Sequence, residues 1–484
     1  MKIIHSLTIL IAATLVSCSP KLPETQLTVN WRGTLKMDSA YNNPLVDFIY
    51  TADPTAVEHD GRLYVYGTYD QQQCDETHPD SANTYERINS LAMMSTTDMV
   101  NWTYHGIIPT KKLAPWIIAS WAPTICSRVE ADGNTHFYLY FSNSGFGTGV
   151  LTATSPVGPW TSPLEHSIVD AKTPGLGDCN VPFDPGVVID GNGTGWLAFG
   201  AGKARIAKLG ADMLSFDSPF VEIKAPHHFE ANELNVIGGK LVYTYNIDWQ
   251  PKDDWTLAAE KPSICSMAYM LPEGDPLSTD SWRYQYHYIK NPGEDGFEYS
   301  NNHTHLHKYQ GEWYLFGHTM SLKSNRRIKG GYRNMCVQQI TMDEENARIG
   351  MSRYTHEGVK QIRPLDPFAQ QEMETTAATV GIRFEAEGKP GNMVAMSDST
   401  GAIMVRGAEF GKKAKTLIIH AQGEGQIDVR LDSPEGQLLA SSLIQSPSQQ
   451  AHTLRLIASP EEGTHSLVFL LQGKTLRVDK WQMK

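Results

Sequence analysis

Four ionisable side chains of this 484-residue chain stand eight or nine positions before a glycine: Asp53 before Gly61, Asp184 before Gly193, Glu230 before Gly239 and His303 before Gly311. Two carboxyl groups that face one cavity can act as a general acid and a general base. Taken singly, each residue has a plainer interpretation, because Asp-Pro pairs such as Asp53-Pro54 often form turns and Glu230 fits a solvated loop. The shared offset favours a functional cluster, since turn residues have no reason to keep this register.

The glycines begin a repeat that predicts the elements around these residues. Together with Gly133 they precede five runs rich in aromatic and β-branched residues, spaced 46 to 72 residues apart. Each run predicts a hairpin, and the spacing leaves room for a four-stranded sheet. Five such sheets around one axis form a five-bladed β-propeller, so the predicted fold class is all-β. A β-sandwich is the competing fold, and a long fivefold repeat disfavours it.

In a propeller, each residue that precedes a turn glycine by eight or nine positions begins the innermost strand of its blade and points to the central axis. Thr124, nine residues before Gly133, takes this place in the second blade and lies close to Trp121. We therefore expect three carboxylates, a histidine and a tryptophan to line one funnel. Trp121 alone would equally fit a core.

The composition limits the classes of partner. The chain carries 41 Lys and Arg against 53 Asp and Glu, a net charge of −12, and it has no basic run. Nucleic acid is therefore excluded as a partner, because phosphate binding needs clustered positive charge. The 20 Tyr and 11 Trp serve cores and also offer flat apolar faces to sugars.

The N-terminus predicts export. Lys2 precedes an apolar stretch that is too short to span a bilayer and ends in Leu15-Val16-Ser17-Cys18, which resembles a bacterial lipoprotein signal. We expect residues 1–18 to be the signal peptide, a lipid on Cys18 to be the only membrane attachment, and residues 19–40 to form a flexible tether. An ordinary signal peptide is the alternative. The predicted location is extracytoplasmic, on a bacterial and by resemblance outer membrane.

A change in composition divides the rest of the chain. All Tyr and ten of the eleven Trp lie at or before Tyr354, and Trp481 is the only Trp or Tyr after residue 371. The segment Arg363-Pro364-Leu365-Asp366-Pro367 then reads as a linker. We expect a propeller over residues 41–365 and a smaller domain over 371–484. The five cysteines after Cys18 show no regular spacing and are expected to be scattered thiols.

Seven separated motifs of the first domain resemble glycoside hydrolase family 43, in the order that this family shows. They are Asn43-Pro44 with Thr51-Ala-Asp53-Pro54, Ser95-Thr-Thr-Asp98 with Asn101-Trp102, Trp121-Ala-Pro123, Ser155-Pro-Val-Gly-Pro159-Trp160, Phe183-Asp184-Pro185, Phe229-Glu230-Ala231, and Asn302-His303 with Gly311-Glu-Trp313-Tyr314. The resemblance implies a five-bladed propeller and an inverting glycosidase acting on arabinose- or xylose-containing glycans. Thr124 departs from the pattern, because many members carry Asp there.

The resemblance also implies roles. Asp53 is the expected general base, Glu230 the general acid, and Asp184 the residue that raises the pKa of Glu230 and orients it. Glu233 is the rival acid, but it lies out of register, six residues before Gly239. Trp121, Arg333 and His303 are expected to bind substrate. Arg333 in particular could hold Asp184 ionised or bind a sugar hydroxyl.

The run His303-Thr-His305-Leu-His307 raises the question of a metal. Alternate strand residues share a face, so the three imidazoles would suit zinc, and a zinc hydrolase is the second hypothesis. Against zinc, only His303 fits the axial register. By resemblance, His303 helps to hold a structural calcium ion or a water cluster in the channel. No organic cofactor is expected.

The small domain has strand-like runs and resembles carbohydrate-binding module family 6, a β-sandwich. The resemblance rests on Phe384-Glu-Ala-Glu387, Val405-Arg-Gly-Ala-Glu-Phe410-Gly, Arg430-Leu-Asp-Ser-Pro434-Glu-Gly and Gly463-Thr-His465. Ala402 stands where sugar binders of this family usually carry an aromatic residue. We therefore expect the domain to stabilise the propeller rather than to bind sugar, which weakens a third hypothesis, a non-catalytic glycan-binding lipoprotein.

Together these features predict an inverting exo-glycosidase that removes terminal α-L-arabinofuranosyl residues from plant-type polysaccharides or oligosaccharides. A β-xylosidase or β-galactofuranosidase of the same fold is the close alternative, since loops around a common funnel set the choice of sugar.

Overall fold

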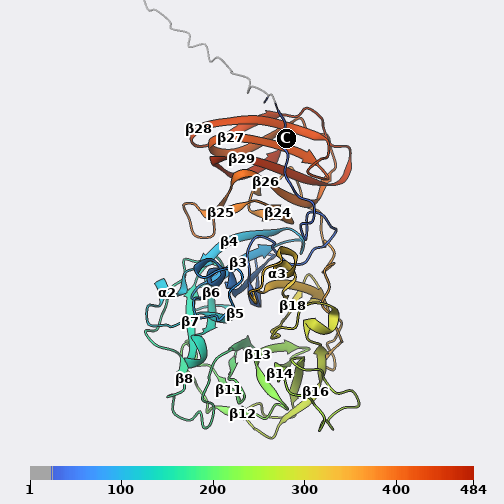
Figure 1. Ribbon diagram of the computed structural model, residues 1–484. Helices are drawn as coiled ribbons and strands as arrows, with labels where there is room; N and C mark the ends of the chain where they lie inside the picture. Colours follow the sequence, from blue (N-terminus) through green and yellow to red (C-terminus); the bar gives the residue numbers. More distant parts are fainter. Residues whose placement is uncertain (1–22, 24) are drawn as a thin grey trace, which may run out of the picture.

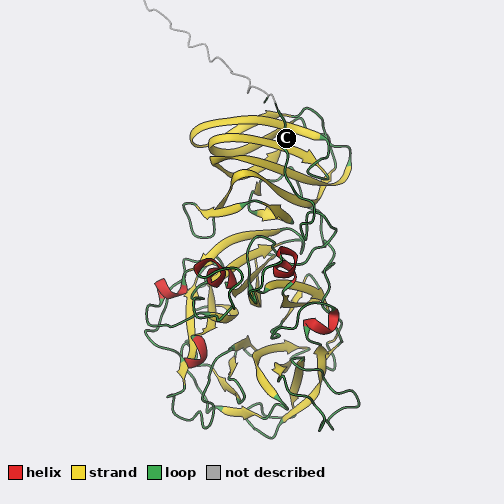
Figure 2. Cartoon of the chain, viewed as in Figure 1, coloured by secondary structure: helices red, strands yellow, loops and turns green. Residues whose placement is uncertain are grey.

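The computed structural model describes residues 23 and 25–484, which form a ring of five sheets with a second β domain stacked on one side (Figure 1). The predicted all-β class is confirmed, and helices are short and few (Figure 2). Among the described residues, no helix is long and apolar enough to cross a membrane. The signal peptide and Cys18 lie outside the described residues.

The five innermost strands each begin one antiparallel sheet, and the sheets follow one another along the chain. Most neighbouring innermost strands contact each other around the axis. These strands are β1 (Ala52–His59), β5 (Trp121–Val129), β9 (Gly186–Ile189), β13 (His228–Ile237) and β17 (His305–Tyr309). The five-bladed propeller predicted from the glycine repeat is confirmed.

The outer strands complete the blades in sequence order. They are β2 (Arg62–Thr68), β3 (Leu91–Thr96) and β4 (Trp102–Ile108) in blade one; β6 (Thr135–Ser142), β7 (Gly147–Ala153) and β8 (Val169–Asp170) in blade two; β10 (Gly195–Phe199), β11 (Ala204–Lys208) and β12 (Val221–Ile223) in blade three; β14 (Lys240–Ile247), β15 (Met267–Pro272) and β16 (Trp282–Ile289) in blade four; and β18 (Glu312–Thr319) and β19 (Asn334–Gln339) in blade five. Short helices α1 (Asp70–Glu76), α2 (Thr110–Leu113) and α3 (Ser321–Arg326) lie in the connections.

Two-residue turns explain why the repeat begins at glycine. Asp60 and Gly61 join β1 to β2 with φ of 49° and 71°, and Gln310 and Gly311 join β17 to β18 with φ of 52° and 90°. Both central residues of such a turn need positive φ, which glycine adopts without a Cβ clash. These turns bring β2 and β18 back beside β1 and β17.

Blade five has three strands rather than the expected four, and an earlier segment completes the ring. The amide of Leu45 donates to the carbonyl of Met335 over 2.9 Å, and that of Thr51 donates to the carbonyl of Arg333 over 2.9 Å. Residues before blade one thus lie along the last strand of the propeller. The ring is closed by backbone hydrogen bonds between residues 45–51 and residues 333–335.

The C-terminal domain is built from long strands that bend from one layer into the other. They are β26 (Met393–Phe410), β27 (Thr416–Leu431), β28 (Leu438–Arg455) and β29 (Gly463–Met483), with the short β22 (Gln371–Glu372), β24 (Ala378–Val380) and β25 (Arg383–Ala386) at their edges. Trp481 is 1% exposed in the apolar core between the layers, as its position predicts. One further strand, β23 (Thr375–Thr376), pairs with β4 and joins the domain to blade one.

The tether predicted over residues 19–40 is wrong for its described part. Leu27, Trp31 and Met37 are buried against the C-terminal domain, where they cover Ala402 and its neighbours. The amide of Leu27 also donates to Asp428 over 2.7 Å. The polar composition suggested a linker, but three spaced apolar side chains suffice to fix the segment. We call residues 25–38 the N-terminal strap.

The five described cysteines are free and buried, as expected of scattered thiols.

Candidate active site

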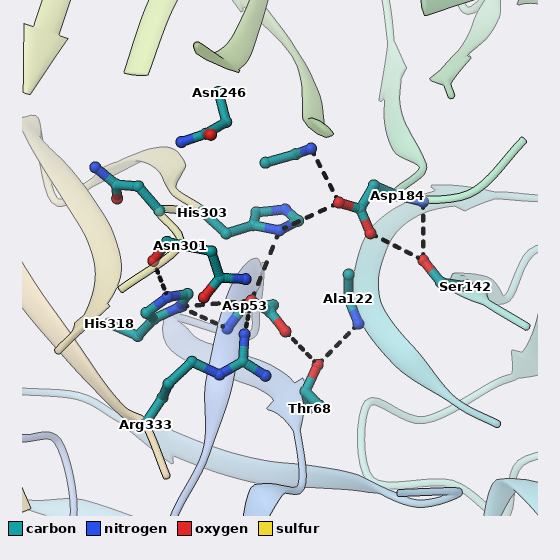
Figure 3. Close-up of polar contacts among 12 residues, drawn as sticks. Asp53, Thr68, Ala122, Ser142, Asp184, Asn246, Asn301, His303, His318 and Arg333 are labelled. Atoms are coloured by element: carbon teal, nitrogen blue, oxygen red, sulfur yellow. Dashed lines mark hydrogen bonds and ion pairs between the residues drawn. The ribbon is translucent and has the colours of Figure 1, made fainter. Parts of the chain in front are cut away.

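A cavity of about 480 Å³ opens at the end of the axis where the innermost strands begin. Its lining includes Asp53, Asp184, Glu230, His303, Trp121 and Arg333, so the structure brings together every residue predicted for the site. Aromatic side chains complete the wall and rim: Tyr85, Phe183, Phe229, Trp249 and Tyr299. Figure 3 shows the polar contacts at its centre.

A left-handed residue at the start of four blades turns the chain into this cavity. Asp53, Ala122, Asp184 and Ala231 have φ of 51°, 37°, 50° and 57°. The strand register is interrupted beside Asp53, Ala122 and Ala231, as in β-bulges, which re-aim side chains at functional sites. The bulges explain how carboxylates reach the mouth rather than alternating along a regular strand.

Side chains of the preceding blade hold three of these left-handed residues. The amide of Ala122 donates to the Thr68 hydroxyl over 2.8 Å, and that of Asp184 to the Ser142 hydroxyl over 2.8 Å. The Ala231 amide donates to Asp184 Oδ2 over 2.9 Å. Because buried amides need an acceptor, these bonds fix the strained backbone at the junctions between blades.

Asp53 is buried and surrounded by groups that favour its charged form. Burial opposes ionisation, but the charge of Arg333 and a hydrogen bond from Thr68 outweigh it and lower the pKa of Asp53 to about 2. Arg333 Nη1 donates to Asp53 Oδ1 over 2.8 Å, and Thr68 donates to Oδ2 over 2.7 Å. Asp53 is therefore a carboxylate across the neutral pH range.

The expectation that Arg333 holds Asp184 is wrong. Besides Asp53, the guanidinium binds Asp70 through Nε and Nη2, at 3.0 and 2.9 Å. It also lies over the ring of Tyr85, 4.9 Å from the ring centre. Asp70 is fully buried at the start of α1 and also accepts the backbone amide of Arg333. Asp70 thus orients the guanidinium, and Arg333 places its remaining charge on Asp53.

Glu230 has the opposite electrostatic environment. Burial raises its pKa, and the nearby Asp184 and Asp53 raise it further, to about 8. No arginine or lysine forms an ion pair with it in the described chain. Asp184 contacts the backbone next to Glu230 through the Ala231 amide, and its own pKa is raised by burial. The cavity therefore holds a charged Asp53 and a protonated Glu230 at neutral pH.

Glu233, the rival acid, lies outside the cavity lining. Its Oε1 is 2.6 Å from His305 Nδ1 in the interior of the propeller, where burial raises its pKa well above the usual value. His305 Nε2 in turn lies 3.3 Å from His307 Nδ1. The ring nitrogens of His305 are thus engaged with neighbours, and His303 points away into the cavity (Figure 3). The three imidazoles do not converge as a zinc site requires.

The residues also do not fit a directly bound calcium ion. Calcium takes roughly six to eight oxygen ligands, whereas His303 offers a ring nitrogen with Asp53 and Asp184 at 3.7 and 4.0 Å. Among the described residues, no group of three or more His, Cys, Asp or Glu is arranged to hold a metal ion. A calcium ion held through water stays a prediction, which elemental analysis of the purified protein tests.

Blade two departs from the predicted register. Ala122 occupies the bulge and Trp121 the wall of the cavity, while Thr124 lies two residues deeper and accepts the amide of Val187 over 3.1 Å. The count from Gly133 was misleading because β5 combines a bulge with a five-residue turn before β6, whereas β1 has the same bulge with a two-residue turn. Thr124 therefore stabilises the contact between blades two and three.

Sequence reasoning missed the residues that orient this site. Thr68, Asp70, Ser142 and His318 lie at or just after the ends of second strands and contact Asp53, Arg333 or Asp184. Their types are common and their partners are far away in the chain, so no local pattern marks them. Their shared place at the ends of the second strands is the one signal that the repeat offers.

The family follows from a comparison with known proteins. A sequence model described as glycosyl hydrolases family 43 matches residues 41–347. The chain belongs to glycoside hydrolase family 43. Curated relatives include an "Arabinoxylan arabinofuranohydrolase" of Bacillus subtilis (strain 168), 33% identical over 441 residues that cover 84% of each chain, and one of Paenibacillus polymyxa, 31% identical over 437 residues that cover 84% of this chain and 67% of that protein.

The similarity to solved structures extends over both domains of this family 43 enzyme. The crystal structure of a glycoside hydrolase family 43 arabinoxylan arabinofuranohydrolase from Bacillus subtilis, in complex with cellotetraose, superimposes with a TM-score of 0.84 at 31% identity. The match covers 93% of this chain and 99% of that one. The C-terminal β domain thus has a counterpart in that enzyme, together with the propeller.

Proposed function

We propose that this family 43 enzyme is an inverting exo-glycosidase that removes terminal α-L-arabinofuranosyl residues from arabinose-containing polysaccharides or oligosaccharides. The observation that carries the proposal is a single cavity with one carboxylate kept ionised, Asp53, and one carboxylic acid kept protonated, Glu230. Similarity to the two arabinoxylan arabinofuranohydrolases supports arabinofuranose as the sugar.

The two carboxyl groups take complementary roles in one displacement. Asp53 accepts a proton from a water molecule as the water oxygen forms a bond to the anomeric carbon. The glycosidic bond breaks on the opposite face of the sugar, and the leaving oxygen takes the proton of Glu230. Asp53 ends protonated and Glu230 ionised, and exchange with solvent at the open cavity restores both.

The surroundings fit these roles. Asp184 keeps Glu230 protonated by its negative charge and, through the Ala231 amide, fixes the backbone that carries it. Trp121, whose indole nitrogen donates to the Tyr85 carbonyl over 3.1 Å, offers a wall for the sugar ring. His303 and Arg333 supply polar contacts for hydroxyl groups at the base. Trp249 and Tyr299, 37% and 52% exposed at the rim, offer aromatic faces to the rest of the glycan.

A panel of 4-nitrophenyl glycosides tests the choice of sugar. We expect hydrolysis of the α-L-arabinofuranoside with a kcat/KM at least about tenfold above those of the β-D-xylopyranoside and β-D-galactofuranoside, and release of free arabinose from arabinoxylan. Proton NMR of the first product would show the inverted anomer. A preference for xyloside or galactofuranoside would replace the proposed sugar, and a retained anomer would contradict the mechanism.

The pH dependence of kcat/KM follows from the two pKa values. Glu230 is active only when protonated, so we expect activity to fall as the pH rises through about 8, the pKa of Glu230. Asp53 is active when ionised, so activity should persist toward acid until the pKa of about 2 is approached or the protein unfolds. Initial rates on an aryl arabinofuranoside between pH 4 and 10 check this. A fall in activity centred near neutral pH or below would contradict the assignment of Glu230.

We also propose the predicted location, with Cys18 lipidated and the enzyme held on the extracytoplasmic side of a bacterial membrane. Cys18→Ser in the full-length gene should release the enzyme from the membrane fraction of a bacterial host, with catalytic constants unchanged. Continued fractionation with membranes would contradict the anchor.

A further inference from the structure

His318 lies at the end of β18, fully buried between two parts of the active site. One edge of its ring faces Asp53 of blade one, and the other faces the connection that carries Asn301 (Figure 3). The sugar cavity is lined by Asp53 and Asn301 but not by His318. Whatever His318 does for the reaction, it does through these neighbours.

The hydrogen bonds define the protonation of the ring. The backbone amide of Asp53 donates to Nδ1 over 3.2 Å, so Nδ1 carries no proton. Nε2 lies 2.8 Å from the carbonyl oxygen of Asn301, which only accepts, so Nε2 carries the proton and donates it. Burial and the neighbouring Arg333 lower the pKa of His318 to about 3, consistent with a neutral ring. His318 is therefore a fixed acceptor on one side and a fixed donor on the other.

The equivalent positions of other blades show what is particular to an imidazole here. Thr68 and Ser142 also accept the amide of the next bulge, each through one hydroxyl oxygen. That same oxygen donates to a carboxylate, Asp53 or Asp184, directly beside it. A single hydroxyl oxygen makes both contacts in Thr68 and in Ser142, whereas the two ring nitrogens of His318 contact groups on opposite sides of the ring. The ring of His318 spans the gap from the Asp53 bulge to Asn301.

Asn301 connects this bridge to Glu230. Its side chain lines the same cavity as Glu230, and the hydrogen-bonding capacity of its amide acts to lower the pKa of Glu230, against burial and the charges of Asp184 and Asp53. The other titratable groups near Glu230 are Arg333, Tyr85 and Cys265. The backbone of Asn301 is held by His318, so the position of the amide depends on the ring.

We propose that His318 is a positioning residue that fixes both reacting carboxyl groups at once, the Asp53 bulge through Nδ1 and Glu230 through Nε2–H and Asn301. This inference rests on the proposed roles of Asp53 and Glu230. An inverting reaction depends on the distance between the two carboxyl groups, and the proposal is that one side chain outside the cavity fixes this distance.

Two substitutions separate the halves of the bridge. In His318→Asn, the amide oxygen takes the place of Nδ1 and can accept from Asp53, but nothing reaches Asn301. In His318→Gln, the longer side chain places its amide nitrogen near Nε2 and can donate to Asn301, while the acceptor for Asp53 is lost. Both variants keep a polar side chain of similar size in a buried site.

The expected results differ in kind. His318→Asn should lower kcat by about tenfold to a hundredfold, as misplacement of a reacting group does, chiefly for glycosides with poor leaving groups. The fall in activity at high pH should occur at a higher pH in His318→Asn than in the wild type, because Glu230 loses the donor that lowers its pKa. His318→Gln should lower kcat by a similar factor for all leaving groups alike, with the basic limb unmoved.

His287 supplies the matched control. It is equally buried, but it lies on β16, the outermost strand of blade four, outside the cavity lining. His287→Asn and His287→Gln should leave the pH profile and leaving-group dependence as in the wild type, whatever they do to the melting temperature.

Two outcomes would overturn the inference: near-normal kcat in both His318 variants, or losses that are identical in pH profile and leaving-group dependence. The second outcome would indicate a merely structural residue. All measurements use whichever aryl glycoside the wild type cleaves best. A sugar other than arabinofuranose would thus refute the proposed function and still leave the role of His318 testable.

Discussion

Asp53→Asn is expected to reduce kcat by at least about a hundredfold on every substrate, because an amide cannot accept the proton of the attacking water. The loss should not depend on the leaving group, since activation of water is needed whichever bond breaks. Asp53 is the strongest candidate for this role because Arg333 and Thr68 hold it as a carboxylate. The measurement is kcat on an aryl arabinofuranoside and on arabinoxylan, alongside the melting temperature.

The melting temperature matters because Asp53 is buried beside Arg333. Removal of its charge leaves the guanidinium paired with Asp70 alone, so some loss of stability should accompany the loss of activity. Asp132→Asn, in an exposed turn of blade two, is the control for an Asp-to-Asn change and should leave kcat unaltered. A folded Asp53→Asn enzyme with near-normal turnover would show that the base lies elsewhere.

Glu230→Gln should give the second large effect, with a different signature. On arabinoxylan we expect kcat to fall by at least about a hundredfold, because the departing sugar oxygen is a poor leaving group without a proton. On a dinitrophenyl glycoside the loss should be much smaller, since that phenolate leaves unprotonated. The fall in activity near pH 8 should also disappear, because the group responsible for it is gone.

Glu233→Gln distinguishes the two glutamates of β13. Glu233 is bonded to His305 away from the cavity, and glutamine can keep a hydrogen bond there. We expect Glu233→Gln to retain the basic limb and the wild-type dependence on leaving group. If the limb and the leaving-group effect vanished in Glu233→Gln and persisted in Glu230→Gln, the acid would have to be reassigned.

The family, the propeller and the set of residues around the funnel could be predicted because each leaves a local trace. The turn glycines set the blades, and a constant offset from them marks Asp53, Asp184, Glu230 and His303. The same offset misplaced Thr124, because β5 combines a bulge with a five-residue turn before β6. Bulges are set by packing between blades, which no local window contains.

The charged and polar partners of the site residues could not be predicted either, because they lie far away in the sequence. Arg333 binds Asp53 and Asp70 from positions 280 and 263 residues away, and only the closure of the ring decides that it faces blade one rather than Asp184 in blade three. His318 reaches Asp53 over 265 residues. The polar segment before residue 40 was predicted to be a flexible tether, but it is packed on the C-terminal domain. The sequence did not show this, because the apolar surface that the segment covers belongs to strands near the end of the chain.

The N-terminal strap has a consequence for the order in which the molecule is made. Leu27 meets Asp428 across 401 residues, so the first described segment to leave the ribosome waits for one of the last before its apolar side chains are covered. Contacts of such long range close slowly, and segments exposed in the meantime are prone to aggregation. The propeller between them can close beforehand, since its own seam joins Leu45 to Met335. Truncated chains that end before residue 371 or begin after residue 40 would each expose one side of this apolar contact. Full-length chains should therefore refold with higher yield than either truncation, even where the cavity is intact.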